Sequence, residues 1–383
     1  MSNKCTPESF YNMLVNENID FYSGVPDSLL KDFCYFVDDN IDSKNHVIAA
    51  NEGNALAIGI GYHLATGNIP LIYLQNSGLG NLINPLLSLA DPDVYSIPAL
   101  LLIGWRGEPG VKDEPQHRKQ GKVTLELLEV MGIPFSVLDE NLEKNEIESI
   151  IKKHADSAVK DNQVQALVVR KGFFSKYTSD KEYSPEFKLT REDAIKSIMS
   201  KLNGDELIVA TTGLPSRELY EHRKFSGVGH SFDFLTVGGM GHANQIGLGL
   251  ALNLPERQIV CLDGDGSLLM HMGSMALVGT SNLKNVIHIV LNNGAHDSVG
   301  GQDTVAFKID IKGMAKCAGY KNIYSVIAED EIDSVINDAI KYDGPTFIEV
   351  RLRKGWRPEI GRPTTTPLEN KQAFMNRIRN ISD

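Results

Sequence analysis

The sequence predicts an α/β protein made of two domains, each built around a parallel sheet. Short apolar runs rich in Val, Ile and Leu alternate along the chain with stretches of helical length. The length of 383 residues suggests two or three domains. A charged stretch without apolar period, Lys171 to Lys188, contains Pro185 and separates halves of similar size. We therefore expect domains at residues 1–175 and 188–383, joined by a linker at 176–187.

The first half contains candidate strands that are short, apolar and bounded by turn residues. They are Phe21–Tyr22, His46–Ala50, Leu71–Leu74, Ala99–Ile103, Phe135–Leu138 and Gln165–Val169. The stretches between them have helical length, and the candidate helices are Pro7–Val15, Ser28–Val37, Asn54–Thr66, Leu82–Leu89, Val123–Met131 and Leu142–Lys153. This alternation predicts a parallel sheet flanked by helices.

The second half repeats the alternation. Its candidate strands are Leu207–Ala210, Leu235–Val237, Ile259–Leu262, Val286–Leu291, Asn322–Tyr324 and Thr346–Val350. Between the third and fourth, Leu268 to about Ser281 has the length of one crossover helix. The tail from Lys354 to Pro367 is rich in Arg, Pro and Thr and precedes a short polar helix. This tail is either a packed surface extension or part of an active site, and the sequence leaves both open.

The composition excludes several classes of protein. A formal net charge of −11 argues against nucleic acid as a partner, so an anionic ligand needs a local basic cluster. The four cysteines are scattered, which suggests neither a disulfide framework nor a zinc site. No apolar run has the length of a membrane span, and the N-terminal residues lack the apolar core of a signal peptide. We therefore expect a cytoplasmic protein without a membrane partner.

Two strand ends in the second half carry the most informative motif. The sequence GDG around Asp265 ends one apolar run, and Asn292-Asn293 ends the next. A right-handed βαβ unit brings the carboxyl ends of its strands to one edge of the sheet, so Asp265 and Asn293 are expected side by side. Their oxygens suit Mg²⁺ or Ca²⁺ that holds phosphate. A lone GDG would indicate only a turn; the pair at this spacing is more specific.

An acidic residue in the first half occupies a comparable place. Glu52, in the segment AANEGNA, stands where an apolar strand ends and an Ala- and Gly-rich helix begins. It either interacts with the helix dipole or serves as a buried catalytic acid.

These motifs resemble the thiamine-diphosphate (ThDP)-dependent 2-oxoacid decarboxylases, and within them the branch that acts on phosphonopyruvate and sulfopyruvate. The resemblance covers nearly the whole chain. Its segments are SGVPDSLL (23–30), AANEGNA (49–55), QNSGLGN to LLSL (75–89), GWRGEPG to QG (104–121), TTG to SREL (211–219), VGGMGHA to LAL (237–252), GDGS (264–267), LNNGAHDSVGGQ (291–302) and GRPTTTP (361–367).

The resemblance implies two ThDP-binding-fold domains, a pyrimidine-binding one followed by a diphosphate-binding one, and it assigns cofactor roles. Glu52 matches the acid that hydrogen-bonds the aminopyrimidine ring. The implied Mg²⁺ ligands are Asp265, Asn293 and the backbone oxygen of Ala295. The other implied cofactor contacts are Thr211, Thr212, Gly213, Gly238, Met240, Gly266 and Ser267. On composition alone, a Met at this place is more often ordinary core packing, and only the flanking glycines favour the cofactor role.

The expected substrate residues follow from a departure from the family pattern. Simple pyruvate decarboxylases carry a His-His pair after the fourth strand, whereas this chain has Trp105-Arg106. Arg can bind a phosphonate with a fork of donors. The loop that follows adds further cations, although it could be merely solvated. The predicted substrate residues are Arg106, Asn76, His117 and Arg118, and the predicted proton-transfer residues beside Glu52 are Asp27, also a candidate N-cap, and His296.

The resemblance implies decarboxylation of 3-phosphonopyruvate to phosphonoacetaldehyde and CO₂, in phosphonate biosynthesis, with ThDP and Mg²⁺. It also implies a homo-oligomer, at least a dimer, because the family shares each active site between subunits. The alternatives are sulfopyruvate decarboxylation, an acetolactate-type carboligase and a non-catalytic ThDP-binding subunit. The intact Glu52, Asp265 and Asn293 argue against the last. A nicotinamide-dependent enzyme is disfavoured because the required glycine pattern is missing.

Overall fold

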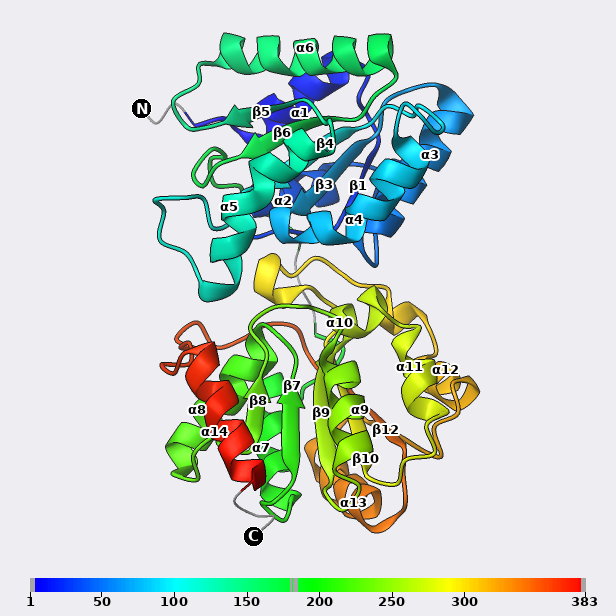
Figure 1. Cartoon of the computed structure of the whole chain (residues 1–383), viewed down its shortest axis with the longest axis vertical. Coiled ribbons are helices and arrows are strands. Elements are labelled where there is room, and N and C mark those ends of the chain that lie inside the picture. The colour runs from blue at the N-terminus through cyan, green and yellow to red at the C-terminus, as the bar shows by residue number, and fades with distance from the viewer. Residues whose placement is uncertain (1–3, 180, 182–184, 380–383) are drawn as a thin grey trace. The chain divides into compact units, whose positions relative to one another are not determined.

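The computed structural model describes residues 4–179, 181 and 185–379. The chain divides into two compact units, residues 1–182 and 183–383. Each unit has one sheet with helices on both faces (Figure 1). The predicted linker at 176–187 falls at this division, and residues 180 and 182–184 of it lie outside the described residues.

The sheet of the first unit has six strands, all parallel, in the order β2-β1-β3-β4-β6-β5. The strands are β1 (Tyr22–Gly24), β2 (His46–Ile48), β3 (Leu71–Gln75), β4 (Leu100–Gly104), β5 (Phe135–Leu138) and β6 (Gln165–Val169). Because the strands are parallel, the ends of β1, β2, β3 and β4 meet at one edge of the sheet.

Helices cover both faces of this sheet. They are α1 (Pro7–Asn16), α2 (Lys31–Asn40), α3 (Glu52–Thr66), η1 (Asn76–Gly78), α4 (Leu79–Pro85), η2 (Leu86–Ala90), α5 (Pro115–Val130) and α6 (Lys144–Asp161). Successive residues of β4 point to opposite faces: Leu100 joins the core under α1, α2 and α6, whereas Leu101 joins the core under α3, α4 and α5. The near-continuous apolar runs of the sequence arise because both faces are buried.

The second unit has a six-stranded parallel sheet in the order β11-β12-β10-β9-β7-β8. Its strands are β7 (Leu207–Ala210), β8 (Asp233–Leu235), β9 (Ile259–Gly264), β10 (Val286–Asn292), β11 (Asn322–Val326) and β12 (Thr346–Arg351). Its helices are α7 (Arg191–Lys201), α8 (Leu214–Ser226), α9 (Ala243–Asn253), α10 (Asp265–Met270), α11 (Ser274–Gly279), η3 (Asp297–Val299), η4 (Ala306–Lys308), α12 (Ile311–Cys317), α13 (Glu329–Lys341) and α14 (Pro367–Arg379). The two parallel sheets with flanking helices confirm the predicted fold class.

Several predicted helices differ in extent from the structure; α6, for example, ends at Asp161, eight residues later than expected. The expected single crossover helix is two short helices, α10 and α11, because His271 leaves helical geometry at φ −135° and ψ 48°. Helix α5 begins at Pro115, eight residues earlier than expected, because proline suits the first helical position. His117 and Arg118 therefore lie on the first turn of a helix and not in a loop.

No helix in the described part of the chain combines the length and the apolar character needed to cross a membrane.

Candidate active site

Glu52 is a buried carboxylate at the first position of α3. Its helix begins there because Asn51 is the N-cap, with its side chain accepting from the N–H of Asn54 at 2.9 Å. Glu52 is only 5% exposed, and its Oε2 accepts from Nδ2 of Asn81 at 2.6 Å. A Cβ at Gly78 would lie 2.2 Å from its Oε1. The amide of Asn81 thus holds Oε2, and the absence of a side chain at Gly78 leaves space for Oε1. Both residues are present in the sequence, but the sequence does not show that they contact Glu52.

Asp27 is a second buried carboxylate at the same sheet edge. Its Oδ1 accepts from Nε2 of Gln75 at 2.6 Å, and its Oδ2 accepts from the N–H groups of Leu29 and Leu30 at 2.9 and 3.2 Å. Asp27 therefore caps the turn before α2, which begins at Lys31, three residues later than expected. Burial raises the pKa of Asp27 above its ordinary value.

Arg106 follows β4 and forms a two-pronged ion pair. Its Nε and Nη2 donate to Asp113 at 2.8 and 2.6 Å, and its Nη1 donates to the Ser28 hydroxyl at 2.7 Å. Burial alone would raise the pKa of Asp113, but hydrogen bonds from Arg106 and the N–H of Gly107 hold it below its ordinary value. A guanidinium has five N–H donors. Because these partners take three, two donors have no hydrogen-bond partner within the part of the chain that the structure describes.

Asn76 fixes the backbone of Arg106. Its Nδ2 donates to the carbonyl of Arg106 and to the hydroxyl of Thr124, each at 2.8 Å, and its Oδ1 accepts from the N–H of Arg106 at 3.1 Å. Asn76 is 1% exposed. Both of its amide hydrogens are therefore used to tie the end of β3 to the end of β4 and to α5.

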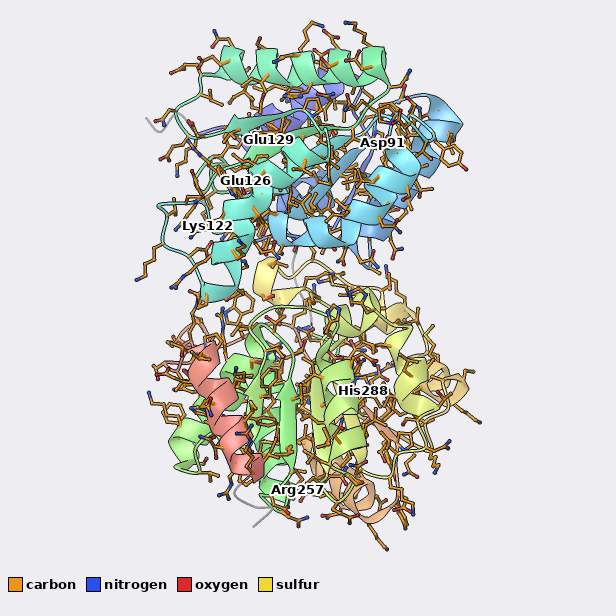
Figure 2. All side chains as sticks on the ribbon, in the orientation of Figure 1. Asp91, Lys122, Glu126, Glu129, Arg257 and His288 are labelled. Atoms are coloured by element: carbon orange, nitrogen blue, oxygen red, sulfur yellow. The ribbon has the colours of Figure 1, made fainter. Side chains whose placement is uncertain are left out.

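The first turn of α5 carries polar atoms that lack partners. Nδ1 of His117 and Oε1 of Gln116 are buried without a hydrogen bond in the described part of the chain. Burial lowers the pKa of His117 to about 4, so its ring is neutral near pH 7. Arg118 beside them is exposed. Further along the helix the charged side chains lie on its exposed face, including Lys122, Glu126 and Glu129 (Figure 2).

The second unit places Asp265 and Asn293 at the ends of adjacent strands. In the register of β9 and β10, Gly264 pairs with Leu291, so the two site residues follow directly at the same edge. Both are 2% exposed. Oδ2 of Asp265 accepts from the hydroxyl of Thr304 at 2.5 Å. Burial raises the pKa of Asp265 to about 6, although this hydrogen bond lowers it.

Ala295 lies in the loop after Asn293. The loop folds back as Ala295 pairs with Asp303 in an antiparallel bridge. Two hydrogen bonds close the bridge: the N–H of Thr304 donates to the Gly294 carbonyl at 2.8 Å, and that of His296 to the Gln302 carbonyl at 2.9 Å. Neither bond uses the carbonyl of Ala295, which leaves that oxygen for another ligand.

A buried polar chain supports the end of β9. The ring of His288, on β10 (Figure 2), lies 3.3 Å from Oδ2 of Asp263 and 2.9 Å from the Tyr320 hydroxyl. Oδ1 of Asp263 accepts from the N–H of Gly264 at 2.9 Å. These contacts fix the backbone that leads into Asp265.

Hydroxyl groups from two predicted diphosphate loops meet in the second unit. Oγ1 of Thr211 and Oγ of Ser267 are 2.9 Å apart, and Ser267 accepts from the N–H of Gly241 at 3.0 Å. Thr212 and Gly213 form the turn before α8, where Gly213 has a φ of 95° that favours glycine. These hydroxyls and N–H groups are the kind that bind phosphate oxygens.

Gly266 lets three loops approach one another. A Cβ there would lie 3.0 Å from ring atoms of His296 and 3.1 Å from the Met240 methyl. Met240 and Gly238 are half-buried. Burial lowers the pKa of His296 to about 4, so this ring is also neutral near pH 7. Met240 thus lies beside Gly266 and is not part of a fully buried core.

The residues of the second unit fit a bound Mg²⁺ and diphosphate. Asp265 is a buried carboxylate without a Lys, Arg or His nitrogen within 4.0 Å among the described residues, so it lacks a cation. A carboxylate, an amide oxygen and a backbone carbonyl are the hard oxygen donors that Mg²⁺ prefers.

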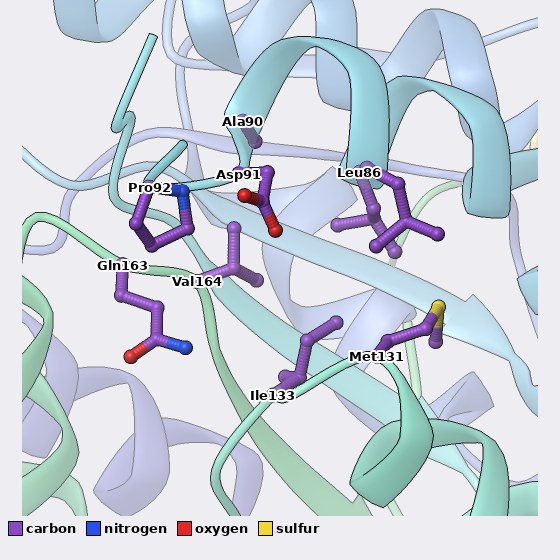
Figure 3. Close-up of a pocket in the computed structure, with 9 residues that line it drawn as sticks. Leu86, Ala90, Asp91, Pro92, Met131, Ile133, Gln163 and Val164 are labelled. Atoms are coloured by element: carbon purple, nitrogen blue, oxygen red, sulfur yellow. The ribbon is translucent and has the colours of Figure 1, made fainter. Parts of the chain in front are cut away.

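A small pocket in the first unit is separate from these residues. It is lined by apolar side chains of η2 and of the segments around Met131 and Val164, together with Asp91 and Gln163 (Figure 3). Gln163 donates to the Gly132 carbonyl at 2.6 Å. None of the residues that line this pocket is a predicted site residue.

Comparison with known proteins decides the family. Residues 6–127 match the N-terminal TPP binding domain of thiamine pyrophosphate enzymes, and residues 211–350 match the C-terminal one. The chain is 33% identical over 345 residues to a phosphonopyruvate decarboxylase of Streptomyces viridochromogenes, with 87% of this chain and 85% of the relative covered. The chain belongs to the thiamine pyrophosphate enzymes.

Two further relatives place it among the decarboxylases of this family. A phosphonopyruvate decarboxylase of Streptomyces hygroscopicus is 34% identical over 349 residues, with 87% of this chain and 84% of the relative covered. A sulfopyruvate decarboxylase of Methanosarcina acetivorans is 29% identical over 372 residues, with 91% of each chain covered. The chain therefore belongs to the decarboxylase branch of the thiamine pyrophosphate enzymes, and membership of the family implies thiamine pyrophosphate, or ThDP, as the cofactor.

Proposed function

We propose that the protein decarboxylates 3-phosphonopyruvate to phosphonoacetaldehyde and CO₂, using ThDP and Mg²⁺. The observation that carries the proposal is Arg106, a half-buried cation with two N–H donors left, at the strand end where the sequence departs from simple pyruvate decarboxylases. The two phosphonopyruvate decarboxylases among its relatives support the same substrate. The product would belong to phosphonate biosynthesis.

The second unit would hold the cofactor. Asp265, Asn293 and the carbonyl of Ala295 would bind Mg²⁺, and the hydroxyls of Thr211 and Ser267 would bind the diphosphate. Bound ThDP supplies an electron-accepting thiazolium ring. The protein supplies orientation and electrostatics.

The first unit would supply proton transfer and substrate binding. Glu52 would hydrogen-bond the aminopyrimidine ring with the oxygen that lies against Gly78. Arg106 would bind the phosphonate through its remaining donors, while Asn76 holds the Arg106 backbone. Nδ1 of His117, which has no hydrogen-bond partner among the described residues, would donate to a substrate oxygen.

Three further residues complete the proposed roles. Arg118 would add positive charge near the anion. Asp27 has a raised pKa and would hold a proton closer to neutral pH than an ordinary carboxyl does. His296 is neutral and would accept or pass on a proton near the metal loop.

Sulfopyruvate is the second candidate substrate, and one observation favours it. Asp113 neutralises Arg106 through two hydrogen bonds, so the pair presents less positive charge than a free guanidinium. A sulfonate carries one charge less than a fully ionised phosphonate and needs less compensation. The sulfopyruvate decarboxylase among the relatives supports this alternative.

The experiment is a substrate panel of phosphonopyruvate, sulfopyruvate and pyruvate, each with ThDP and Mg²⁺, monitored for CO₂ and aldehyde. We expect the highest kcat/KM with phosphonopyruvate.

Arg106→Ala should reduce kcat/KM for phosphonopyruvate at least about tenfold more than for pyruvate, because it removes a charged hydrogen-bond donor. Lys122→Ala is the matched control, since it removes an exposed cation from the same unit. Equal losses on all three acids would remove Arg106 from the anion site, and preference for sulfopyruvate would favour the second candidate.

We also propose that the protein acts in the cytoplasm as a homo-oligomer, at least a dimer, with active sites shared between subunits. Light scattering of the purified protein measures the oligomeric state. A monomer that is fully active would contradict the proposed sharing of active sites between subunits.

A further inference from the structure

Asp297 lies four residues after Asn293 and is 5% exposed. Its Oδ2 accepts from Nδ2 of Asn293 at 2.6 Å and from Nη1 of Arg191 at 3.2 Å. The N–H of Gly355, in the segment after β12, donates to the same carboxylate at 3.1 Å. The carboxylate is therefore held by three separate parts of the second unit, and one of them is a predicted metal ligand.

Arg191 connects this carboxylate to the helices. It is the first residue of α7, where Thr190 is the N-cap, and it is 5% exposed. Its Nε and Nη2 donate to both oxygens of Glu218 on α8 at 2.9 and 3.2 Å. Two carboxylates therefore share one guanidinium. The cluster contains two acidic groups for one basic group.

The chemistry of this contact fixes the orientation of the Asn293 amide. An ionised carboxylate only accepts hydrogen bonds, so the NH₂ group of Asn293 must face Asp297. The amide oxygen then points away from Asp297, where it accepts from the N–H of Ala295 at 3.4 Å and keeps a second lone pair for a cation. If a neutral amide replaced the carboxylate, either end of Asn293 could face it.

We infer that Asp297 is a positioning residue that sets the amide of Asn293 for Mg²⁺, with Arg191 and Gly355 holding Asp297 in place. The inference rests on the proposed Mg²⁺ site. The first residues of the C-terminal tail would then stabilise the loop that follows Asn293. Gly355 donates to Asp297, and Nζ of Lys354 donates to the Gly301 carbonyl at 3.1 Å in that loop. Such support of metal ligands is worth roughly 10- to 100-fold in metal affinity.

The second unit contains a matched control. Arg223 and Asp233 form another buried ion pair, with two hydrogen bonds of 3.0 Å that join α8 to β8. Asp233→Asn removes a buried charge of the same kind. Neither partner of this pair contacts Asp265, Asn293 or Ala295 through a hydrogen bond in the described residues.

The test measures Mg²⁺ binding to the full chain by calorimetry at saturating ThDP. A second measurement follows thermal unfolding of the same proteins in the absence of ThDP and Mg²⁺. We expect Asp297→Asn to raise the Kd for Mg²⁺ at least about tenfold. Asp233→Asn should leave that Kd unchanged, although both variants lower Tm because each leaves a buried Arg with less compensation. If Asp297→Asn does not fold, Asp297→Glu keeps the charge but moves it by one methylene, and a smaller rise in Kd is expected.

A wild-type Kd in the Asp297 variant would overturn the inference, as would equal rises in both variants. Wild-type protein that binds ThDP without any effect of Mg²⁺ would instead contradict the proposed metal site itself.

Discussion

The two units share one sheet topology but carry different chemistry. Read from its β8 edge, the second sheet has the order β8-β7-β9-β10-β12-β11, and the first sheet has the order β2-β1-β3-β4-β6-β5. The two orders are the same when β7 to β12 are matched in sequence with β1 to β6. The same four strand ends carry predicted site residues in both. In the first unit these are Asp27, Glu52, Asn76 and Arg106, and in the second they begin at Thr211, Gly238, Asp265 and Asn293.

The difference lies in the loops. The first unit places charged side chains at its strand ends and holds them with amides such as Asn81 and Asn76. The second unit places glycines and hydroxyls there, together with one buried carboxylate, Asp265, that pairs with no cation among the described residues. We therefore propose that equivalent positions on one scaffold serve proton transfer and anion binding in one unit, and metal and diphosphate binding in the other.

The largest expected effect is on Glu52. Glu52→Gln should reduce kcat by about 10²- to 10⁴-fold, because the amide cannot exchange a proton with the cofactor. Steady-state decarboxylation under saturating ThDP and Mg²⁺ measures this. Turnover at the wild-type rate would show that the first unit does not supply proton transfer through this residue.

A pair of glycine variants tests how closely Glu52 is held. Gly78→Ala would place a methyl group 2.2 Å from Oε1 and 2.6 Å from Cγ of Glu52, so the whole carboxyl end of that side chain would have to move, and we expect kcat to fall roughly 10- to 100-fold. Gly80→Ala is the control, since a Cβ there meets nothing within 4 Å. Parallel assays of both variants give the answer, and equal activities would mean that the position of Oε1 is unimportant.

Asn81 should have a smaller effect of the same kind. Asn81→Ala removes the hydrogen bond to Oε2 of Glu52, and a bond to a charged group is worth about 1.5–3 kcal/mol. We expect kcat/KM to fall about tenfold or somewhat more. Asn84→Ala, at an exposed position of the same helix, is the control and should behave as wild type. If the two variants are indistinguishable, Asn81 does not position Glu52.

The smallest effect concerns stability and pH in the first unit. His46 is buried against the Tyr73 hydroxyl at 2.8 Å, and burial lowers its pKa from 6.5 to about 4. The unfolded chain therefore binds a proton before the folded one does, and stability is lost as pH falls from about 6.5 toward 4. Between pH 7 and 5 this group alone contributes about 2 kcal/mol of loss. Urea unfolding of wild type and His46→Gln at both pH values measures it; an equal loss in the two proteins would rule out His46.

Much of the fold could be predicted because buried parallel strands are apolar on both faces. The bounds of β5, β6 and β7 agree with the predicted runs to the residue. The strand β8 begins and ends two residues earlier than expected, because the buried Asp233 belongs to it and pairs with Arg223. A charged residue inside a strand is not recognisable from periodicity alone.

The site could be predicted in part for a similar reason. The pairing of Asp265 with Asn293 follows from the topology of one βαβ unit, which the sequence reveals. The contacts of Asn81 with Glu52, of Asp113 with Arg106 and of Arg191 with Asp297 join residues 7 to 106 positions apart, and each depends on tertiary packing. No local pattern reports such partners.

The central claim, a division of labour between equivalent strand ends, is tested most directly by ThDP binding in the presence of Mg²⁺. Calorimetry should compare wild type, Glu52→Gln and Asp265→Asn. We predict that Glu52→Gln binds ThDP within a few-fold of wild type while Asp265→Asn loses Mg²⁺-dependent binding, because a buried charged ligand is removed. Loss of binding in the Glu52 variant together with wild-type, Mg²⁺-dependent binding in the Asp265 variant would contradict the account.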